Sequence, residues 1–139
     1  MNFCDRGIEL TRSFRALKLW MSLEVFGVDA FRAAVERGLE LAEEAERILR
    51  GRAHWEIITP AQLGIVTFRW QSAGYSDEEL DALNKALVNA ILVDGFLFAS
   101  STVMNGRTVQ RFCTINPRTN NEDLRLSIDR MEHLAGRLG

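Results

Sequence analysis

The dipeptide Asn105-Gly106 constrains the fold of this chain more than any other pair of residues. Both central residues of a type I′ turn need a positive φ, which asparagine and glycine adopt at little steric cost. The segment that follows, "RTVQRFCTI", is typical of a β-strand. The dipeptide therefore predicts an antiparallel hairpin, which we place from Leu97 to Ile115.

Arg111 occupies an unusual position in this hairpin. Because side chains alternate along a strand, Arg111 shares one face with three apolar residues, namely Val109, Cys113 and Ile115. An unpaired guanidinium on an apolar face is costly. We consider two interpretations: a structural ion pair with a carboxylate, or a guanidinium directed at a substrate carboxylate, which its planar fork matches. On the same pattern, Cys113 is expected to be a small buried hydrophobe.

Apolar spacing predicts the other elements. Leu10, Phe14, Leu17 and Met21 recur every three or four residues, which indicates a helix that Gly27 ends. A second helix follows up to Gly51, with Asp29 as its expected cap. The segments 54–60 and 63–70 are rich in β-branched and aromatic residues and predict two strands separated by a proline, Pro60. Ser76 and Glu79 form a capping-box pattern at the start of a third helix, and a last helix follows residue 121.

The expected order of elements is α, α, β, β, α, β, β, α. This order describes an α+β fold in which helices cover a small antiparallel sheet. We divide the chain into a helical part, residues 1–51, and a small α+β domain, residues 52–139. The first two helices are long for so small a sheet, so we expect them to need more protein than this chain contains.

Composition argues against several classes of partner. The 139 residues include 17 Lys and Arg against 19 Asp and Glu, for a formal charge of −2, with no basic run. Nucleic acid and anionic membranes are therefore not expected as main partners. No apolar run reaches the roughly 18 residues of a membrane span, and the first residues lack the apolar centre of a secretory signal. We expect a soluble, cytoplasmic protein.

No catalytic or metal-binding motif is present. The sequence contains no glycine-rich phosphate loop, His-Glu-x-x-His motif or calcium-binding loop. His54 and His133 have no motif around them and are expected at the surface. Cys4 and Cys113 are too few and too far apart for a disulfide framework or a zinc site. We therefore predict no catalytic residue and no metal site within this chain.

The stretch "TRSFRALKLW" places three positive charges on one side of the first helix. Arg12, Arg15 and Lys18 follow one another at three-residue spacing, and such like charges repel by a few tenths of a kcal/mol per pair. A solvated helix face and a docking surface for carboxylates elsewhere both explain the pattern. The residues alone do not separate the two.

Two segments together resemble a known family. "CDRGIELTRSFRALKLWMSLEVFGVDAFR" and "LFASSTVMNGRTVQRFCTINPRTNNEDL" are similar to the C-terminal part of the group II pyridoxal-phosphate-dependent amino-acid decarboxylases. This family includes the aromatic-amino-acid, tyrosine, glutamate and diaminobutyrate decarboxylases. The resemblance covers essentially the whole chain.

The resemblance implies a fold-type-I enzyme that works as a homodimer and acts on an amino acid. Its large domain carries pyridoxal 5′-phosphate, and its C-terminal small domain closes over the active site. Residues 1–51 would then be a helical connector that packs on the large domain, and residues 52–139 the small domain. The resemblance also implies that Arg111 binds the substrate carboxylate.

The sequence departs from the family pattern in one respect. The family binds its cofactor through a lysine in a His-x-x-Lys motif, and neither His54 nor His133 is followed by lysine at that spacing. Lys18 and Lys85 stand in unrelated helical contexts. We therefore expect no cofactor on this chain alone and no activity from it. The alternative is a stand-alone interaction module that keeps the small-domain fold and binds a partner chain.

Overall fold

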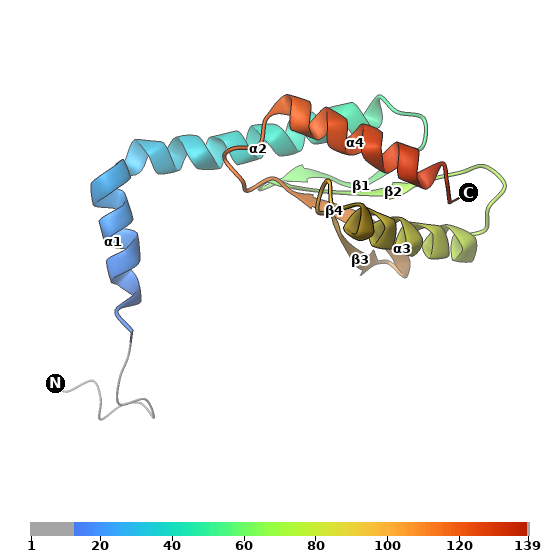
Figure 1. Ribbon diagram of the computed structural model, residues 1–139, viewed down its shortest axis with the longest axis horizontal. Helices are drawn as coiled ribbons and strands as arrows, with labels where there is room; N and C mark the ends of the chain where they lie inside the picture. The colour runs from blue at the N-terminus through green and yellow to red at the C-terminus, as the bar shows by residue number, and fades with distance from the viewer. Residues whose placement is uncertain (1–12, 139) are drawn as a thin grey trace. The chain divides into compact units, whose positions relative to one another are not determined.

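Four helices and a four-stranded sheet make up residues 13–138, the part of the chain that the computed structural model describes (Figure 1). In chain order they are α1 (Arg15–Phe26), α2 (Val28–Arg50), β1 (Trp55–Gln62), β2 (Ile65–Trp70), α3 (Asp77–Asp94), β3 (Ser100–Met104), β4 (Arg107–Cys113) and α4 (Asn121–Ala135). The predicted order and the α+β class are confirmed. Cys4, Leu10 and Arg12 lie outside the described residues.

The strands pair in the order β1-β2-β4-β3, and all neighbours are antiparallel. Asn105 and Gly106 have φ values of 51° and 78°, and Met104 pairs with Arg107 on either side of them. Positive φ at both central residues is the conformation of a type I′ turn. The predicted hairpin is therefore confirmed.

The prediction that Pro60 separates two strands was wrong. Pro60 lies inside β1, and the chain reverses at Leu63 and Gly64, whose φ values are 50° and 78°. A proline is tolerated there because β1 is an edge strand and the ladder shifts register between Ile57 and Gln62. The missing N–H thus interrupts the pairing without ending the strand.

Side chains define the starts of α3 and α4. Ser76 Oγ accepts the N–H of Glu79, and the Glu79 carboxylate accepts the N–H of Ser76 at 2.7 Å, so the predicted capping box is confirmed. Asn120 and Asp123 form a second capping box that the sequence analysis did not identify. Gly95, with φ at 72°, ends α3 in the left-handed conformation.

The core lies on one face of the sheet. Val66, Phe68 and Phe112 project from β2 and β4, and the rings of Phe68 and Phe112 meet edge to face at a centroid distance of 4.8 Å. The second half of α2, together with α3 and α4, covers this face (Figure 1). Their fully buried residues include Leu41, Leu49, Leu87, Ile91, Ile128 and Met131. Each such side chain contributes about 1.5–3 kcal/mol by leaving water.

Residues 13–34 belong to a unit of the chain separate from residues 35–138. None of the residues of α1 is buried, and several large apolar side chains are exposed in this unit. They include Phe14, Trp20, Met21, Val25, Phe26 and Phe31. Gly27 ends α1 as predicted, but Asp29 lies inside α2, where it pairs with Arg32, and does not precede the helix as a cap.

Gly38 allows the end of the sheet to contact α2. The Thr114 hydroxyl donates a hydrogen bond to the Gly38 carbonyl at 2.7 Å. A Cβ atom at Gly38 would lie 2.8 Å from the Thr114 carbonyl oxygen, closer than van der Waals contact permits. Only glycine therefore fits this close approach of two backbones.

We expect Gly38→Ala to lower the free energy of unfolding by about 1–3 kcal/mol, because the added methyl group must push α2 away from the sheet. Urea unfolding of both proteins measures the change. Gly136→Ala is the matched control: Gly136 has a helical φ of −65°, so alanine should be neutral or slightly stabilising there. Equal stability of wild type and Gly38→Ala would show that α2 and Thr114 can move apart at no cost in free energy.

Candidate functional site

The candidate site lies on the side of the sheet away from the core. Phe112 is part of the core, so strand alternation directs Arg111 and Cys113 to the opposite side. The register places Thr67 of β2 and Ser100 of β3 on either side of Arg111. We call the surface formed by Ser100, Thr102, Arg111 and Cys113 the open face; Thr67 lies next to it and is buried.

The open face is less apolar than the sequence pattern suggested. Val109 is buried as expected, but Cys113 is exposed and Ile115 keeps 80% of its surface accessible. The prediction that Cys113 is a buried hydrophobe was therefore wrong. The helices pack on the Phe112 side, so the described residues leave the end of β4 uncovered on the other side.

Arg111 is exposed on this face. Its Nε donates a hydrogen bond to Ser100 Oγ at 3.2 Å. No ion pair joins Arg111 to a carboxylate of any described residue. The structural ion pair is therefore not formed within residues 13–138, and neither Nη group bonds to a described residue.

A second group of charged side chains lies where β2 and β4 meet α3. We call it the strand-end cluster; its members are Glu56, Arg69, Asp77, Asp81 and Arg107. Arg69 is completely buried, and its Nη2 lies 3.0 Å from Asp81 Oδ1 and 3.1 Å from the Asp77 carbonyl oxygen. Asp81 Oδ1 also accepts the N–H of Thr108, so the cluster fixes α3 to the start of β4.

Glu56 and Arg107 form the bidentate pair of this cluster. Arg107 Nη2 donates to Glu56 Oε2 at 2.7 Å, and Nη1 donates to Oε1 at 3.2 Å. These hydrogen bonds lower the pKa of Glu56, against the opposing effect of partial burial. Arg107 is the first residue of β4, so the pair joins β1 to the hairpin that carries Arg111. We therefore assign the cluster a structural role.

The lowered pKa of Glu56 gives a pH dependence with a definite sign. Its stabilising effect is present above the unfolded pKa, about 4.3 for glutamate, and is lost as the pH falls through the lower folded pKa. We expect Glu56→Gln to be less stable than wild type at pH 7 and to lose less stability between pH 5 and pH 3.

Urea unfolding at pH 7, 5 and 3 measures this difference. The control is Glu43→Gln, at an exposed position of α2 that makes no ion pair with a described residue; it should keep the wild-type pH dependence. A Glu56→Gln protein that loses as much stability as wild type on acidification would contradict the role of the pair.

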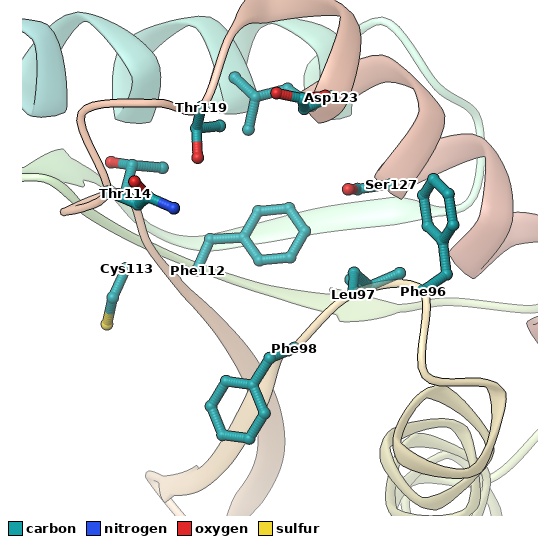
Figure 2. A pocket seen from close by; sticks show the side chains of 11 residues that line it. Phe96, Leu97, Phe98, Phe112, Cys113, Thr114, Thr119, Asp123 and Ser127 are labelled. Atoms are coloured by element: carbon teal, nitrogen blue, oxygen red, sulfur yellow. The ribbon is translucent and has the colours of Figure 1, made fainter.

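A cavity of about 560 Å³ lies on the core side of β4. Figure 2 shows the Phe112 ring between Leu97 and two residues of α4, Asp123 and Ser127. Its lining holds no lysine, arginine or histidine, and the Asp123 carboxylate accepts the N–H of Asn120 at 2.9 Å. The cavity therefore offers no cationic side chain to a phosphate group.

The described residues do not fit pyridoxal phosphate. The cofactor needs three groups: a lysine for the Schiff base, an acidic partner for the pyridine nitrogen and a site for the phosphate. Lys18 and Lys85 are exposed on α1 and α3, and neither lines the cavity. His54 and His133 are exposed as predicted; His54 stacks on Trp70 at a centroid distance of 4.8 Å.

Known proteins are similar to this chain in sequence. The conserved domain of pyridoxal-dependent decarboxylases matches residues 1–71. The aromatic-L-amino-acid decarboxylase of Bacillus atrophaeus is 46% identical over 136 residues, which are 97% of this chain and 28% of that protein. Tryptophan decarboxylase 2 of Oryza sativa subsp. japonica is 34% identical over 86% of this chain and 24% of its own length.

The fold agrees with these matches. A crystal structure of Oryza sativa TDC with PLP and tryptamine superposes with a TM-score of 0.87 at 24% identity; the match covers 99% of this chain and 29% of that chain. The chain belongs to the pyridoxal-dependent decarboxylase family. The solved structures that are similar to it are those of group II decarboxylases. It spans about 28% of the length of the Bacillus relative.

Sequence reasoning identified Arg111 but missed its neighbours. Ser100 and Thr67 flank Arg111 in the sheet, and neither had a motif to mark it. For Ser100 a signal existed: in a two-residue hairpin, residues equally far from the turn face each other, so Ser100 lies opposite Arg111. The strand-end cluster had no such signal, because its members are distant in sequence.

Proposed function

We propose that this chain is the C-terminal part of a pyridoxal-phosphate-dependent amino-acid decarboxylase, in which Arg111 binds the substrate carboxylate. The main support for the proposal is the exposure of the Arg111 side chain and its lack of an ion pair with a described residue. The side chain lies on the open face and has its Nη groups available for a carboxylate. Arginine binds carboxylates in two parallel hydrogen bonds, which fixes orientation as well as charge.

An aromatic L-amino acid is the proposed substrate class. The similarity to the Bacillus aromatic-L-amino-acid decarboxylase, at 46% identity, supports this choice. A carboxylate held by a rigid strand would orient the bond to the departing CO₂ relative to the rest of the active site. The walls that recognise the side chain belong to residues outside this chain.

The cofactor is proposed to be held by a large domain that these 139 residues do not include. The described residues supply no fitting cofactor site, and residues 1–51 would connect to that domain. The exposed apolar side chains of α1 suit burial against it and against the second subunit of a homodimer. Alone, the chain is proposed to be inactive.

The cytoplasm is the proposed compartment. Cys113 is a free, exposed thiol, which suits a reducing environment. No helix among residues 13–138 is long and apolar enough to cross a membrane.

We expect this chain to bind no pyridoxal phosphate in a stoichiometric, reducible form. Mixing the protein with one equivalent of the cofactor and adding borohydride should trap much less than one cofactor per chain, spread over accessible amines, because no pocket holds the ring beside Lys18 or Lys85. Mass spectrometry of the reduced protein measures the outcome. One trapped cofactor per chain at either lysine would overturn the cofactor-free proposal.

In the complete enzyme, we expect Arg111→Met to lower kcat/KM by about 30-fold or more, because truncating one partner of a charge pair at a binding site costs at least about 2 kcal/mol. The free energy of unfolding should change by less than about 0.5 kcal/mol, since Arg111 is exposed. Steady-state kinetics and urea unfolding measure the two effects.

Arg118→Met is the matched control, because Arg118 is also exposed and lies outside the open face. It should leave kcat/KM within about twofold of wild type. Comparable losses from the two substitutions, or a loss of stability that accounts for the loss of activity in Arg111→Met, would argue against substrate binding.

The exposed apolar side chains of α1 also favour a second candidate, a stand-alone module that binds a partner chain. The nucleotide sequence upstream of Met1 separates the two. An in-frame large domain with a His-x-x-Lys motif supports the decarboxylase, and an independent gene supports the module.

A further inference from the structure

Ser100 restrains the guanidinium of Arg111. Ser100 and Arg111 are directly opposite each other in β3 and β4. Such cross-strand neighbours have Cβ atoms about 4.5–5.5 Å apart, within reach of a side-chain hydrogen bond. The bond is formed: Arg111 Nε donates to Ser100 Oγ at 3.2 Å.

This bond selects one edge of the guanidinium. Arginine can bind a carboxylate side-on, through Nε and one Nη, or end-on, through both Nη atoms. In this structure Nε is engaged by Ser100, so the side-on edge is occupied. The end-on edge remains, and no described residue bonds to it.

We propose that Ser100 is a positioning residue that fixes Arg111 so that both Nη groups receive the substrate carboxylate. The inference rests on the proposed substrate-binding role of Arg111 and adds the residue that sets its orientation. Ser100 itself acts through Arg111.

The chain offers a matched control on the same strand. Ser101 follows Ser100, lies opposite Gln110 and therefore points to the other side of the sheet. Ser101→Ala removes the same hydroxyl group from the same strand without touching Arg111. Ser100→Thr keeps a hydroxyl and tests whether the hydrogen bond is the property that matters.

The experiment uses the complete enzyme with the variants Ser100→Ala, Ser100→Thr, Ser101→Ala, Arg111→Met and the double variant Ser100→Ala with Arg111→Met. We expect Ser100→Ala to lower kcat/KM about fivefold to tenfold, mainly through KM, as the loss of one hydrogen bond predicts. Ser100→Thr and Ser101→Ala should stay within about twofold of wild type. In the Arg111→Met background, Ser100→Ala should have no further effect.

A binding measurement separates positioning from a general structural role. Phenylpropionate and phenylpropanol share an aromatic part and differ in the carboxylate, so they serve as competitive probes. Ser100→Ala should raise the inhibition constant of phenylpropionate about fivefold and leave that of phenylpropanol unchanged. Equal weakening of both probes would overturn the inference.

The remaining outcomes distinguish the two levels of the proposal. If Arg111→Met loses activity and Ser100→Ala either has no effect or acts equally in both backgrounds, the role of Ser100 is wrong while that of Arg111 stands. If Arg111→Met keeps wild-type kcat/KM, the substrate-binding role fails, and the positioning role fails with it.

Discussion

The turn at Asn105 and Gly106 determines which residues of β3 and β4 face each other, because a two-residue hairpin leaves no freedom of register. That register sets Ser100 beside Arg111, and the pairing of β4 with β2 sets Thr67 on the other side. A slip of one residue would turn Arg111 into the core and Phe112 away from it. The position of the candidate site therefore depends on this turn and on the core that holds Phe112.

The helices cover one face of the sheet, and the two faces have different roles. The core side holds the domain together through Phe68 and Phe112, while the open face presents a charged group on a rigid strand. The strand-end cluster supports this arrangement by joining β1 and α3 to the start of β4. Arg111 makes no ion pair with a described residue, and the chain spans about 28% of the length of the Bacillus relative. Under the proposed function, its free Nη groups would face the rest of the enzyme.

Local sequence patterns were sufficient to predict the helices, strands and turns. They were insufficient to predict which of these elements contact one another. The hairpin turn and the capping box at Ser76 follow from residues close in sequence, and both were predicted. The exposure of Cys113 was not, because it depends on which face the distant helices cover. Arg69 and Asp81 meet only after α3 packs against the sheet, so their pairing left no local pattern. The proposed role of Arg111 came from the family resemblance and not from its local pattern.

We propose that the substrate carboxylate lies against Arg111. A crystal structure of the complete enzyme with a bound substrate analogue tests it most directly. We expect both carboxylate oxygens within about 2.7–3.0 Å of the two Nη atoms, with Nε still bonded to Ser100. A carboxylate bound elsewhere, with Arg111 paired to an acidic side chain of the large domain, would show that Arg111 has a structural role and does not bind substrate.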